Sequence, residues 1–490
     1  MSGSDWWDEE FDVVVLGGGG AGLMAAVEAA ESGAAVLLLE KQPSLGGATG
    51  MAVGSITAAG TDLQKKAGIP DDVDGHYRDL MTMMEVANRR GEEYNLELSR
   101  LMVEIAPGVI ERLTGLGVQF SGPHPEPPHE VYRMHSVVPD SNSYIELLSK
   151  AAQERGVVIR TSTTVHELQR DGSGAVVAVS IRGIRSNQTK AVKVNRAVIL
   201  AAGDFSANDE LARQNGRPPQ VSAIDPIRSY ATGDGILLAT AVGAGTVAMH
   251  RTGSPNFRTC LPPYCSPAQE LFQLGGILVN RNGRRFTDEL AQPVFASNDQ
   301  PGKTAMLIFD ATVAGHVATA DEDDGSIRDG WYRNGKISLC TFPAVAYAYI
   351  ADLLEHTEYL VEASGLAQLA EKTGLPASAL ESDIAGYNKA VRGEQKDSVG
   401  RTQFGAEVSK RPFYAFGPIK PFLIFSGGGL SVDREMHVLD EEGRVIPHLY
   451  AAGVNGEAGV FLGGHGHHLA WAFGTGRIAG KNAAAERPST

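Results

Sequence analysis

The sequence has few cysteines, and none of them forms a CxxC pair. The three thiols are Cys260, Cys265 and Cys340 in a chain of 490 residues. This number excludes a disulfide framework, and it argues against a zinc or iron–sulfur centre built on thiolates. Because unpaired thiols are typical of a reducing compartment, we expect a cytoplasmic protein.

Positive charge and long apolar runs are also scarce. Lysine and arginine total 43 against 58 acidic residues, which gives a net charge of −15 at neutral pH. This balance argues against a nucleic acid or an anionic membrane surface as the main partner. The first residues are acidic where an export signal would be basic, and no apolar run approaches the roughly 18 residues of a membrane span. We therefore expect neither export nor membrane insertion.

Glycine, in contrast, is abundant and clustered. The chain holds 58 glycines, which is above the usual share of about 7%. Residues 11–41 predict a buried strand over 13–16, a glycine turn, a helix over 21–32 and a second buried strand over 34–39. Similar strand signals recur at 157–161, 175–181, 196–200 and 448–451. The chain therefore begins with a βαβ unit, and its C-terminal segment returns to the same fold.

The turn after the first strand has the spacing GxGxxG. Gly17 permits a tight turn, Gly19 lets a pyrophosphate approach the backbone, and Gly22 allows the helix to pack closely on the strand. The helix N-terminus favours the negative phosphates. Glu40 ends the second strand, where a carboxylate accepts hydrogen bonds from ribose hydroxyls. These features predict a dinucleotide-binding, Rossmann-like α/β fold.

A second glycine-rich segment, LEKQPSLGGATGMAVGSI, follows directly and favours FAD over NAD. With AAGDF (201–205), TGDG (232–235), GGILVNRNGRRFTDE (275–289) and the C-terminal GTGRIAGKNAA, it resembles the flavoprotein family of fumarate reductase, succinate dehydrogenase, L-aspartate oxidase and the 3-ketosteroid dehydrogenases. The resemblance covers nearly the whole chain. It implies non-covalent FAD, because GGATGMAVG lacks the histidine through which relatives attach flavin.

The glycine motif and the resemblance together predict the residues that bind the cofactor. They are Gly17, Gly19, Ala21, Gly22, Glu40, Lys41, Gly46, Gly47, Ala48, Thr49, Gly54, Ser55, Val165, Ala202, Gly203, Asp234, Gly453, His468 and Leu469.

Changes in composition along the chain also predict two domains. An FAD-binding domain comprises residues 1–250 and is completed by residues 421–490, and an inserted α+β cap domain for substrate comprises residues 251–420. Aromatic and proline residues increase within that insert, as expected of a separate unit. The proline-rich stretch 121–130 predicts an exposed loop.

The substrate predicted by the resemblance is a carbonyl compound. Relatives move a hydride between flavin and a carbon beside an activated C–C bond. The arginines and histidine with which fumarate reductases hold dicarboxylates are missing: ELAQPVFASND (289–299) lacks arginine, and Ser426 and the turn at Gly463 occupy the other places. In ketosteroid dehydrogenases a backbone N–H before the last helix polarises the ketone, and Gly466 matches that position.

The segment GGHGHHLAWAF supplies histidines beside this glycine. His465 and His467 are candidate bases at neutral pH, and Tyr264 and Tyr132 are further candidates for proton transfer. The tyrosines that ketosteroid dehydrogenases use are absent here. The histidines could instead only hydrogen-bond flavin or backbone. We expect no metal among His465, His467 and His468, because residues so close on a turn seldom converge on one ion.

The prediction is therefore an FAD-dependent dehydrogenase that introduces a C=C bond beside the carbonyl of a cyclic or steroid-like ketone, or of a related acid. An external acceptor or oxygen would take the electrons. Two alternatives stay open: an ene-reductase of an unsaturated acid, and a flavin-binding protein without catalysis.

Overall fold

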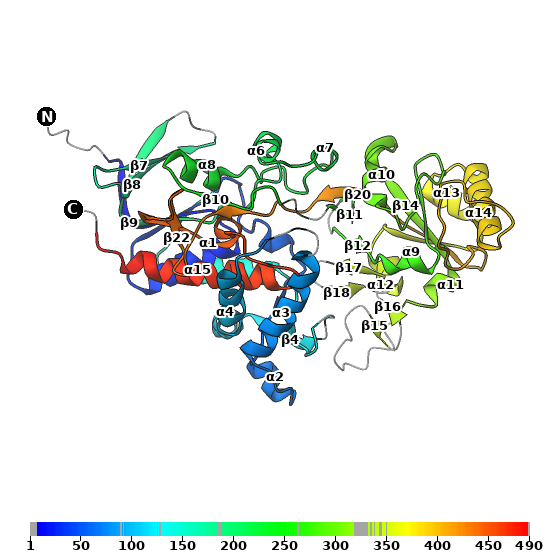
Figure 1. Cartoon of the computed structure of the whole chain (residues 1–490), viewed down its shortest axis with the longest axis horizontal. Coiled ribbons are helices and arrows are strands. Elements are labelled where there is room, and N and C mark those ends of the chain that lie inside the picture. Colours follow the sequence, from blue (N-terminus) through cyan, green and yellow to red (C-terminus); the bar gives the residue numbers. More distant parts are fainter. Residues whose placement is uncertain are drawn as a thin grey trace. The chain divides into compact units, whose positions relative to one another are not determined.

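The chain forms two compact units (Figure 1). The computed structural model describes residues 7–88, 91, 93–124, 126, 129–184, 186, 188–251, 253, 255–261, 264–317, 332–333, 336–337, 339–342, 345–348 and 350–488. The first unit comprises Met1–Arg217, Arg228–Gly253 and Phe425–Thr490, and the second comprises Pro218–Ile227 and Ser254–Ile424. Within the described part, no helix has the length and apolar character needed to cross a membrane.

A mixed sheet of eight strands forms the centre of the first unit, in the order β22-β23-β9-β1-β2-β6, with β7 and β8 continuing from β9. Its strands are β1 (Glu9–Leu16), β2 (Val36–Leu39), β6 (Val158–Arg160), β7 (Thr163–Arg170), β8 (Val176–Gly183), β9 (Thr189–Leu200), β22 (His437–Leu439) and β23 (Val445–Ala451). β1 is parallel to both β2 and β9, and β9 is parallel to β23. The C-terminal strand thus completes a sheet begun at the N-terminus, as the sequence predicted.

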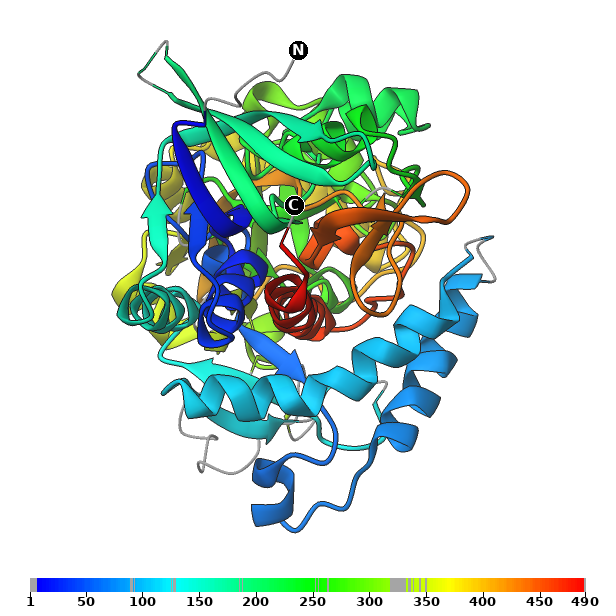
Figure 2. The ribbon, with the colours of Figure 1, turned by 90° about the vertical axis from the view of Figure 1, so that its left-hand side faces the viewer.

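The parallel strands are short apolar runs because both faces of the sheet are covered. Val13, Val14 and Val15 in β1 are fully buried, and Val36 to Leu39 in β2 are buried throughout. Figure 2 shows α1 (Gly20–Glu31), α5 (Asn142–Glu154) and α15 (His467–Ala485) side by side along one face of the sheet.

Small residues let α1 and α15 approach closely. A side chain on Gly476 would lie 2.3 Å from the Ala21 carbonyl oxygen, and one on Gly480 would lie 2.4 Å from the Ala25 carbonyl oxygen. Glycine is therefore required along this face of α15. The contact holds the middle of α15 in a fixed place beside the first two turns of α1.

Smaller elements complete the first unit. A three-stranded sheet has the order β3-β5-β4. The elements are β3 (Ser55–Thr57), α2 (Asp62–Lys66), α3 (Val73–Asn88), α4 (Leu96–Gly115), β4 (Gln119–His124), β5 (Met134–Val138), α6 (Asp209–Gln214), α8 (Asp234–Ala241), β10 (Thr246–Val247) and β21 (Gly429–Leu430), with the short helices η1 (Thr49–Met51) and η4 (Gly453–Gly456).

The second unit is α+β and has its own core. Its main sheet has the order β11-β20-β14-β13, with β19 beside β20. The elements are α7 (Pro219–Ser222), β11 (Pro255–Thr259), β12 (Ser266–Pro267), α9 (Glu270–Leu274), β13 (Ile277–Val279), α10 (Pro293–Asn298), β14 (Ala305–Asp310), β17 (Cys340–Phe342), β18 (Val345–Ala348), α12 (Ile350–His356), β19 (Leu360–Ala363), α13 (Leu366–Thr373), α14 (Ala377–Val391) and β20 (Phe413–Leu423).

A buried network of charges joins distant segments of the second unit. Arg285 pairs with Glu289 at 2.9 Å and with Asp397 at 2.5 Å, and Arg401 pairs with Glu289 at 3.0 Å. All four side chains are at most 1% exposed. The segment 275–289, which carries part of the family resemblance, therefore contributes charged side chains to the interior of this unit. Loss of one partner would leave an unpaired buried charge.

Candidate active site

The carboxyl ends of three neighbouring parallel strands meet in the first unit. β1 continues into Gly17, β9 into Ala201, and β23 into Ala452. The Ala201 N–H donates to the Leu16 carbonyl, and the Ala452 N–H donates to the Leu200 carbonyl. Ligands of open α/β sheets bind outside this edge.

The three motif glycines meet different demands. A side chain on Gly17 would lie 2.2 Å from the Ala201 carbonyl oxygen, and one on Gly22 would lie 1.9 Å from the Gly17 carbonyl oxygen. The protein itself therefore requires these two glycines. A side chain on Gly19 would have no neighbour closer than 3.9 Å, and its φ of −81° suits any residue. The absence of a side chain there leaves open space beside the start of α1, which fits the approach of a pyrophosphate.

Glu40 holds the glycine turn in place. Its two carboxylate oxygens accept hydrogen bonds from the Gly18 N–H at 2.8 Å and the Gln42 N–H at 2.7 Å. The side chain is buried, and each oxygen keeps a second lone pair. Glu40 can therefore fix the turn and still accept a ribose hydroxyl.

The second glycine loop packs directly on the first. Gly19 and Gly46 form a parallel bridge, and the Gly46 N–H donates to the Gly18 carbonyl at 2.9 Å. The Thr49 hydroxyl accepts the Gly20 N–H at 3.1 Å. The loop runs through Gly47 and Ala48 to Gly54 and Ser55, where buried Tyr144 donates its hydroxyl proton to the Gly54 carbonyl. The structure thus joins the two predicted cofactor loops.

Further predicted cofactor residues contact one another. The Lys41 ammonium donates to the Asp234 carboxylate at 2.8 Å, at the first residue of α8. The Asn455 side chain bonds the backbone that follows β9. It accepts the Ala202 N–H at 2.6 Å and donates to the Gly203 carbonyl at 2.7 Å. Asn455 was missed by the sequence analysis, although it follows a predicted strand.

The remaining predicted cofactor residues lie in α1, β7 and the α15 region. A side chain on Gly453 would lie 3.0 Å from the Ala21 side chain, and the Trp471 indole donates to the Gly453 carbonyl at 3.1 Å. Leu469 is buried in the first turn of α15. Val165 lies within β7, opposite Ile181 of β8. These contacts bring the ends of β1, β9 and β23 together with the two glycine loops. Val165 instead belongs to the hairpin formed by β7 and β8.

Adjacent histidines before and within α15 have separate surroundings. The His465 side chain is 38% exposed and lies 3.8 Å from the Glu126 carboxylate, which also accepts the His465 N–H at 3.1 Å. His467 is fully buried, and burial lowers its pKa to about 3. The His468 ring packs edge-on against Phe425 at 4.8 Å, and burial lowers its pKa to about 4. Both rings are therefore neutral at pH 7, although the His468 side chain is only half-buried.

The burial of Glu126 contradicts the prediction that residues 121–130 form an exposed loop. Glu126 and His129 lie within 121–130, yet they are only 7% and 9% exposed. Burial raises the pKa of the Glu126 carboxyl, while His465 opposes that rise. The prediction failed because proline and charge mark irregular backbone rather than exposure.

Gly466 lies between the partly exposed His465 and the fully buried His467. Its φ is +81°, and a side chain there would lie 2.4 Å from the Thr57 backbone nitrogen in β3, so only glycine fits. The Thr57 hydroxyl donates to the His465 carbonyl at 2.7 Å. Within the described part of the chain, the Gly466 N–H donates to no protein acceptor. This N–H and the first amides of α15 are donors available to a ligand.

The two predicted tyrosines lie elsewhere. The Tyr132 carbonyl accepts the Gln64 side-chain N–H at 2.9 Å, and the Tyr132 side chain is half-buried. Tyr264 belongs to the second unit, where its ring lies 6.1 Å from that of Phe422. Their predicted roles stay predictions.

Comparison with known proteins identifies the family. The family model of the FAD binding domain matches residues 12–461. A probable fumarate reductase of Shewanella frigidimarina is 27% identical over 460 residues, which is 91% of this chain and 70% of that protein. An NADH:acrylate oxidoreductase of Vibrio harveyi is 31% identical over 365 residues, but that match spans 70% of this chain and 32% of that protein.

Solved structures agree with this assignment. The open conformation of a flavocytochrome c3 fumarate reductase has a TM-score of 0.79 at 25% identity, and the match covers 98% of this chain and 79% of that chain. A 3-ketosteroid Δ4-(5α)-dehydrogenase of Rhodococcus jostii shares the fold, with a TM-score of 0.63 at 24% identity over 99% of both chains. These matches confirm the predicted family and α/β fold. The chain belongs to the FAD binding domain family, as an FAD-dependent oxidoreductase related to fumarate reductases.

Proposed function

We propose that this protein dehydrogenates the carbon pair next to a carbonyl group, in a cyclic or steroid-like ketone or a related acid. The observation that carries the proposal is the pairing of accessible His465 with buried Glu126, directly beside the available N–H of Gly466. This arrangement combines a base with a donor for the carbonyl oxygen, and loss of a proton next to a carbonyl requires both.

His465 is the candidate base of the pair. Its side chain is 38% exposed, and Glu126 accepts its backbone N–H and lies 3.8 Å from its ring. A carboxylate beside the ring stabilises the imidazolium that forms when a proton is taken. His467 is fully buried, so we assign proton transfer to His465 rather than to His467.

Gly466 is the candidate donor to the carbonyl oxygen. Its N–H lies at the entrance to α15, where the helix dipole favours the negative charge that develops on that oxygen. The close contact with Thr57 in β3 fixes the direction of the peptide. A backbone donor held in this way needs no reorganisation during the reaction.

FAD fits the residues at the strand ends, as the open space beside Gly19 indicates. When bound, FAD supplies the two-electron acceptor that takes a hydride from the second carbon of the pair. Oxygen or an external acceptor then receives the electrons.

We include non-covalent FAD and a cytoplasmic location in the proposal. The loop from Gly46 to Gly54 holds no histidine for attachment, and the cysteine count suits a reducing compartment. Acid precipitation of the holoprotein checks the first point, because dissociable FAD stays in the supernatant and attached flavin sediments with the protein. Fractionation of native cells checks the second.

Anaerobic flavin spectroscopy tests the reaction. Saturated cyclic ketones, 3-ketosteroids and dicarboxylates are added separately to the oxidised holoprotein while flavin absorbance is recorded. Bleaching by a ketone supports the proposal, and bleaching by none of the carbonyl compounds contradicts it. With an active ketone, His465→Gln should slow bleaching by about 10²- to 10⁴-fold without loss of flavin. The control is His166→Gln, which changes an exposed histidine on β7.

A second candidate function is reduction of an unsaturated acid, which the names of the relatives favour. They include fumarate and acrylate reductases and a urocanate reductase of Eggerthella lenta. In this direction His465 would donate a proton and the reduced cofactor would donate the hydride. If only chemically reduced holoprotein reacts, and it does so with unsaturated acids, this second function replaces the first.

A further inference from the structure

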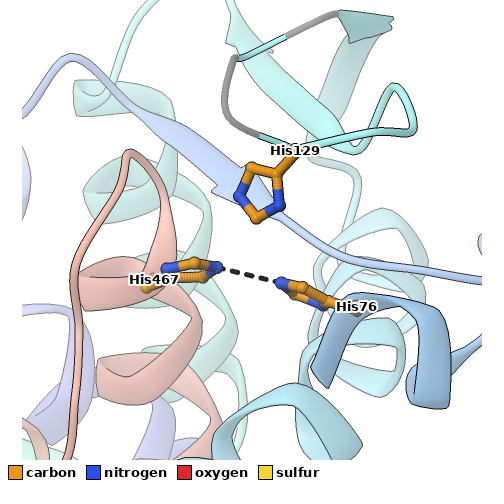
Figure 3. Close-up of side chains that lie close together, drawn as sticks. All are labelled: His76, His129 and His467. Carbon is orange, nitrogen blue, oxygen red and sulfur yellow. Dashed lines mark hydrogen bonds between the residues drawn. The ribbon is translucent and has the colours of Figure 1, made fainter. Parts of the chain in front are cut away.

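Three histidines from separate segments meet in the interior of the first unit (Figure 3). His76 comes from α3, His129 from the segment between β4 and β5, and His467 from the first turn of α15. One ring nitrogen from each lies within 4.8 Å of the other two. The Nε2 atoms of His76 and His467 are 2.9 Å apart. All three side chains are buried.

The surroundings of His467 direct a lone pair toward the cluster. The His467 Nδ1 atom bonds the Gly463 carbonyl, so Nδ1 carries the proton and Nε2 offers a lone pair. A ring nitrogen that donates to a carbonyl is the usual support of a histidine that binds metal. The His129 Nδ1 atom accepts from the Arg133 guanidinium at 3.3 Å, and its Nε2 atom is buried without a hydrogen-bond partner.

Charge next to the cluster favours a cation. Buried Arg133 pairs with both Asp71 and Asp79, and these three side chains are at most 9% exposed. One guanidinium and two carboxylates give this group a formal charge of −1, which a bound cation would balance.

We propose that His76, His129 and His467 bind one divalent transition-metal ion, of which zinc is the best match. Neutral imidazole is a preferred ligand of zinc, and among the described residues the cluster contains no carboxylate, the ligand that magnesium and calcium require. Three imidazoles leave one tetrahedral position for a solvent oxygen. The site is separate from the His465 and Glu126 pair and does not depend on the proposed reaction.

Such an ion would join three segments that are remote in the sequence. It would connect α3 and the segment before β5 to the first residue of α15, one residue after Gly466. The expected consequence is a more ordered turn before α15 and a higher resistance to unfolding when the ion is bound.

Metal binding by the full-length flavoprotein tests the proposal. Protein treated with chelator is dialysed against Zn²⁺ or Co²⁺, and metal content, visible absorption and thermal unfolding are measured. We expect one ion per chain, the visible bands of tetrahedral Co²⁺ and a higher unfolding temperature. His76→Gln and His129→Gln should each weaken binding by more than about 100-fold, because loss of a supporting residue alone costs about 10- to 100-fold.

The matched control is His135→Gln. His135 is fully buried in β5 and bonds the Thr61 hydroxyl at 2.8 Å, outside the cluster. It should bind metal like the unchanged protein. Absence of stoichiometric binding by the unchanged protein would overturn the proposal, as would equal binding by all variants. If ligand variants fail to fold, anomalous scattering from crystals soaked in Zn²⁺ decides: a peak among the three rings supports the site, and its absence there refutes it.

Discussion

The glycine turn after β1 and the histidine turn before α15 lie at neighbouring places in the same unit, but they follow different rules. The glycine turn obtains several contacts from nearby sequence: Gly22 packs on Gly17, and Glu40 accepts the Gly18 N–H, although Ala201 also lies against Gly17. The histidine turn obtains its contacts from far away. Its ring partners Glu126 and His76 are 339 and 391 positions distant from the residues they contact.

The difference shows what a local motif can specify. The glycine turn depends on its backbone conformation, because main-chain atoms occupy the space that side chains would need at Gly17 and Gly22. The histidine turn depends on its side chains, and the chemistry of each ring is set by the residues that it contacts. The three nearly adjacent histidines therefore differ more from one another in burial and in contacts than the three motif glycines do.

The largest expected effect comes from adding one methyl group to the glycine turn. In Gly22→Ala the new carbon would lie 1.9 Å from the Gly17 carbonyl oxygen, so the turn and α1 must separate. We expect a loss of about 3 kcal/mol or more in the free energy of unfolding, and loss of FAD. Urea unfolding and flavin content measure both.

The control for this change is Gly115→Ala, near the end of α4, where a side chain meets open space. Its free energy of unfolding should change by less than about 1 kcal/mol. If Gly22→Ala behaves like this control, the close packing of α1 on β1 is wrong.

A buried acid near the histidine turn gives the next effect. Burial raises the pKa of Glu457 from 4.5 to about 8, although the Gly428 N–H and Arg251 oppose the rise. The folded protein thus holds a proton that the unfolded chain releases at pH 4.5. This contribution to stability is present below pH 4.5 and is lost as the pH rises toward 8, by a few kcal/mol.

Glu457→Gln removes that dependence, because the amide stays neutral at every pH. Chemical unfolding of the holoprotein between pH 5 and 8.5 should show the variant gaining on the parent as the pH rises. Glu442→Gln is the control, since that side chain is exposed on the turn between β22 and β23. Parallel curves for parent and Glu457→Gln would show that Glu457 is ionised in the folded state.

The fold was predictable from sequence where it depends on contiguous patterns. The apolar run Val13–Val15, the glycine spacing and the second run ending at Leu39 predict β1, α1 and β2 with boundaries within a few residues. The return of the chain in β23 could also be predicted, because that strand has the same buried character.

The site was predictable only in part. His465 stood out by its position next to Gly466, but nothing near it indicates Glu126, whose segment was expected to be exposed. The cluster of His76, His129 and His467 joins three segments through tertiary packing, so no spacing in the sequence predicts it. The weak available signal was a glutamate among prolines and a histidine directly after them.

Removing the charge of Glu40 tests the glycine turn more gently. Glu40→Gln replaces a carboxylate that accepts two backbone N–H groups, and the amide nitrogen would face one of them as a second donor. Hydrogen bonds to charged groups contribute about 1.5–3 kcal/mol, so FAD should bind roughly 10- to 100-fold more weakly.

Equilibrium titration of apoprotein with FAD measures this affinity. Glu111→Gln, an exposed position on α4, is the control and should bind FAD like the parent. Unchanged affinity in Glu40→Gln would mean that the carboxylate supports only the turn and does not contact the ribose.

The smallest effect is expected at a histidine outside both turns. His437 in β22 bonds the Asp433 carboxylate at 2.8 Å, and that bond raises its pKa. Its contribution to stability is therefore full below pH 6.5 and is lost as the pH rises through the raised value. Because both side chains are about a quarter exposed, His437→Gln should cost less than about 1 kcal/mol at pH 6 and less at pH 9. Chemical unfolding of parent and variant at the two pH values measures the difference. A larger cost at pH 9 than at pH 6 would show that His437 acts through packing rather than charge.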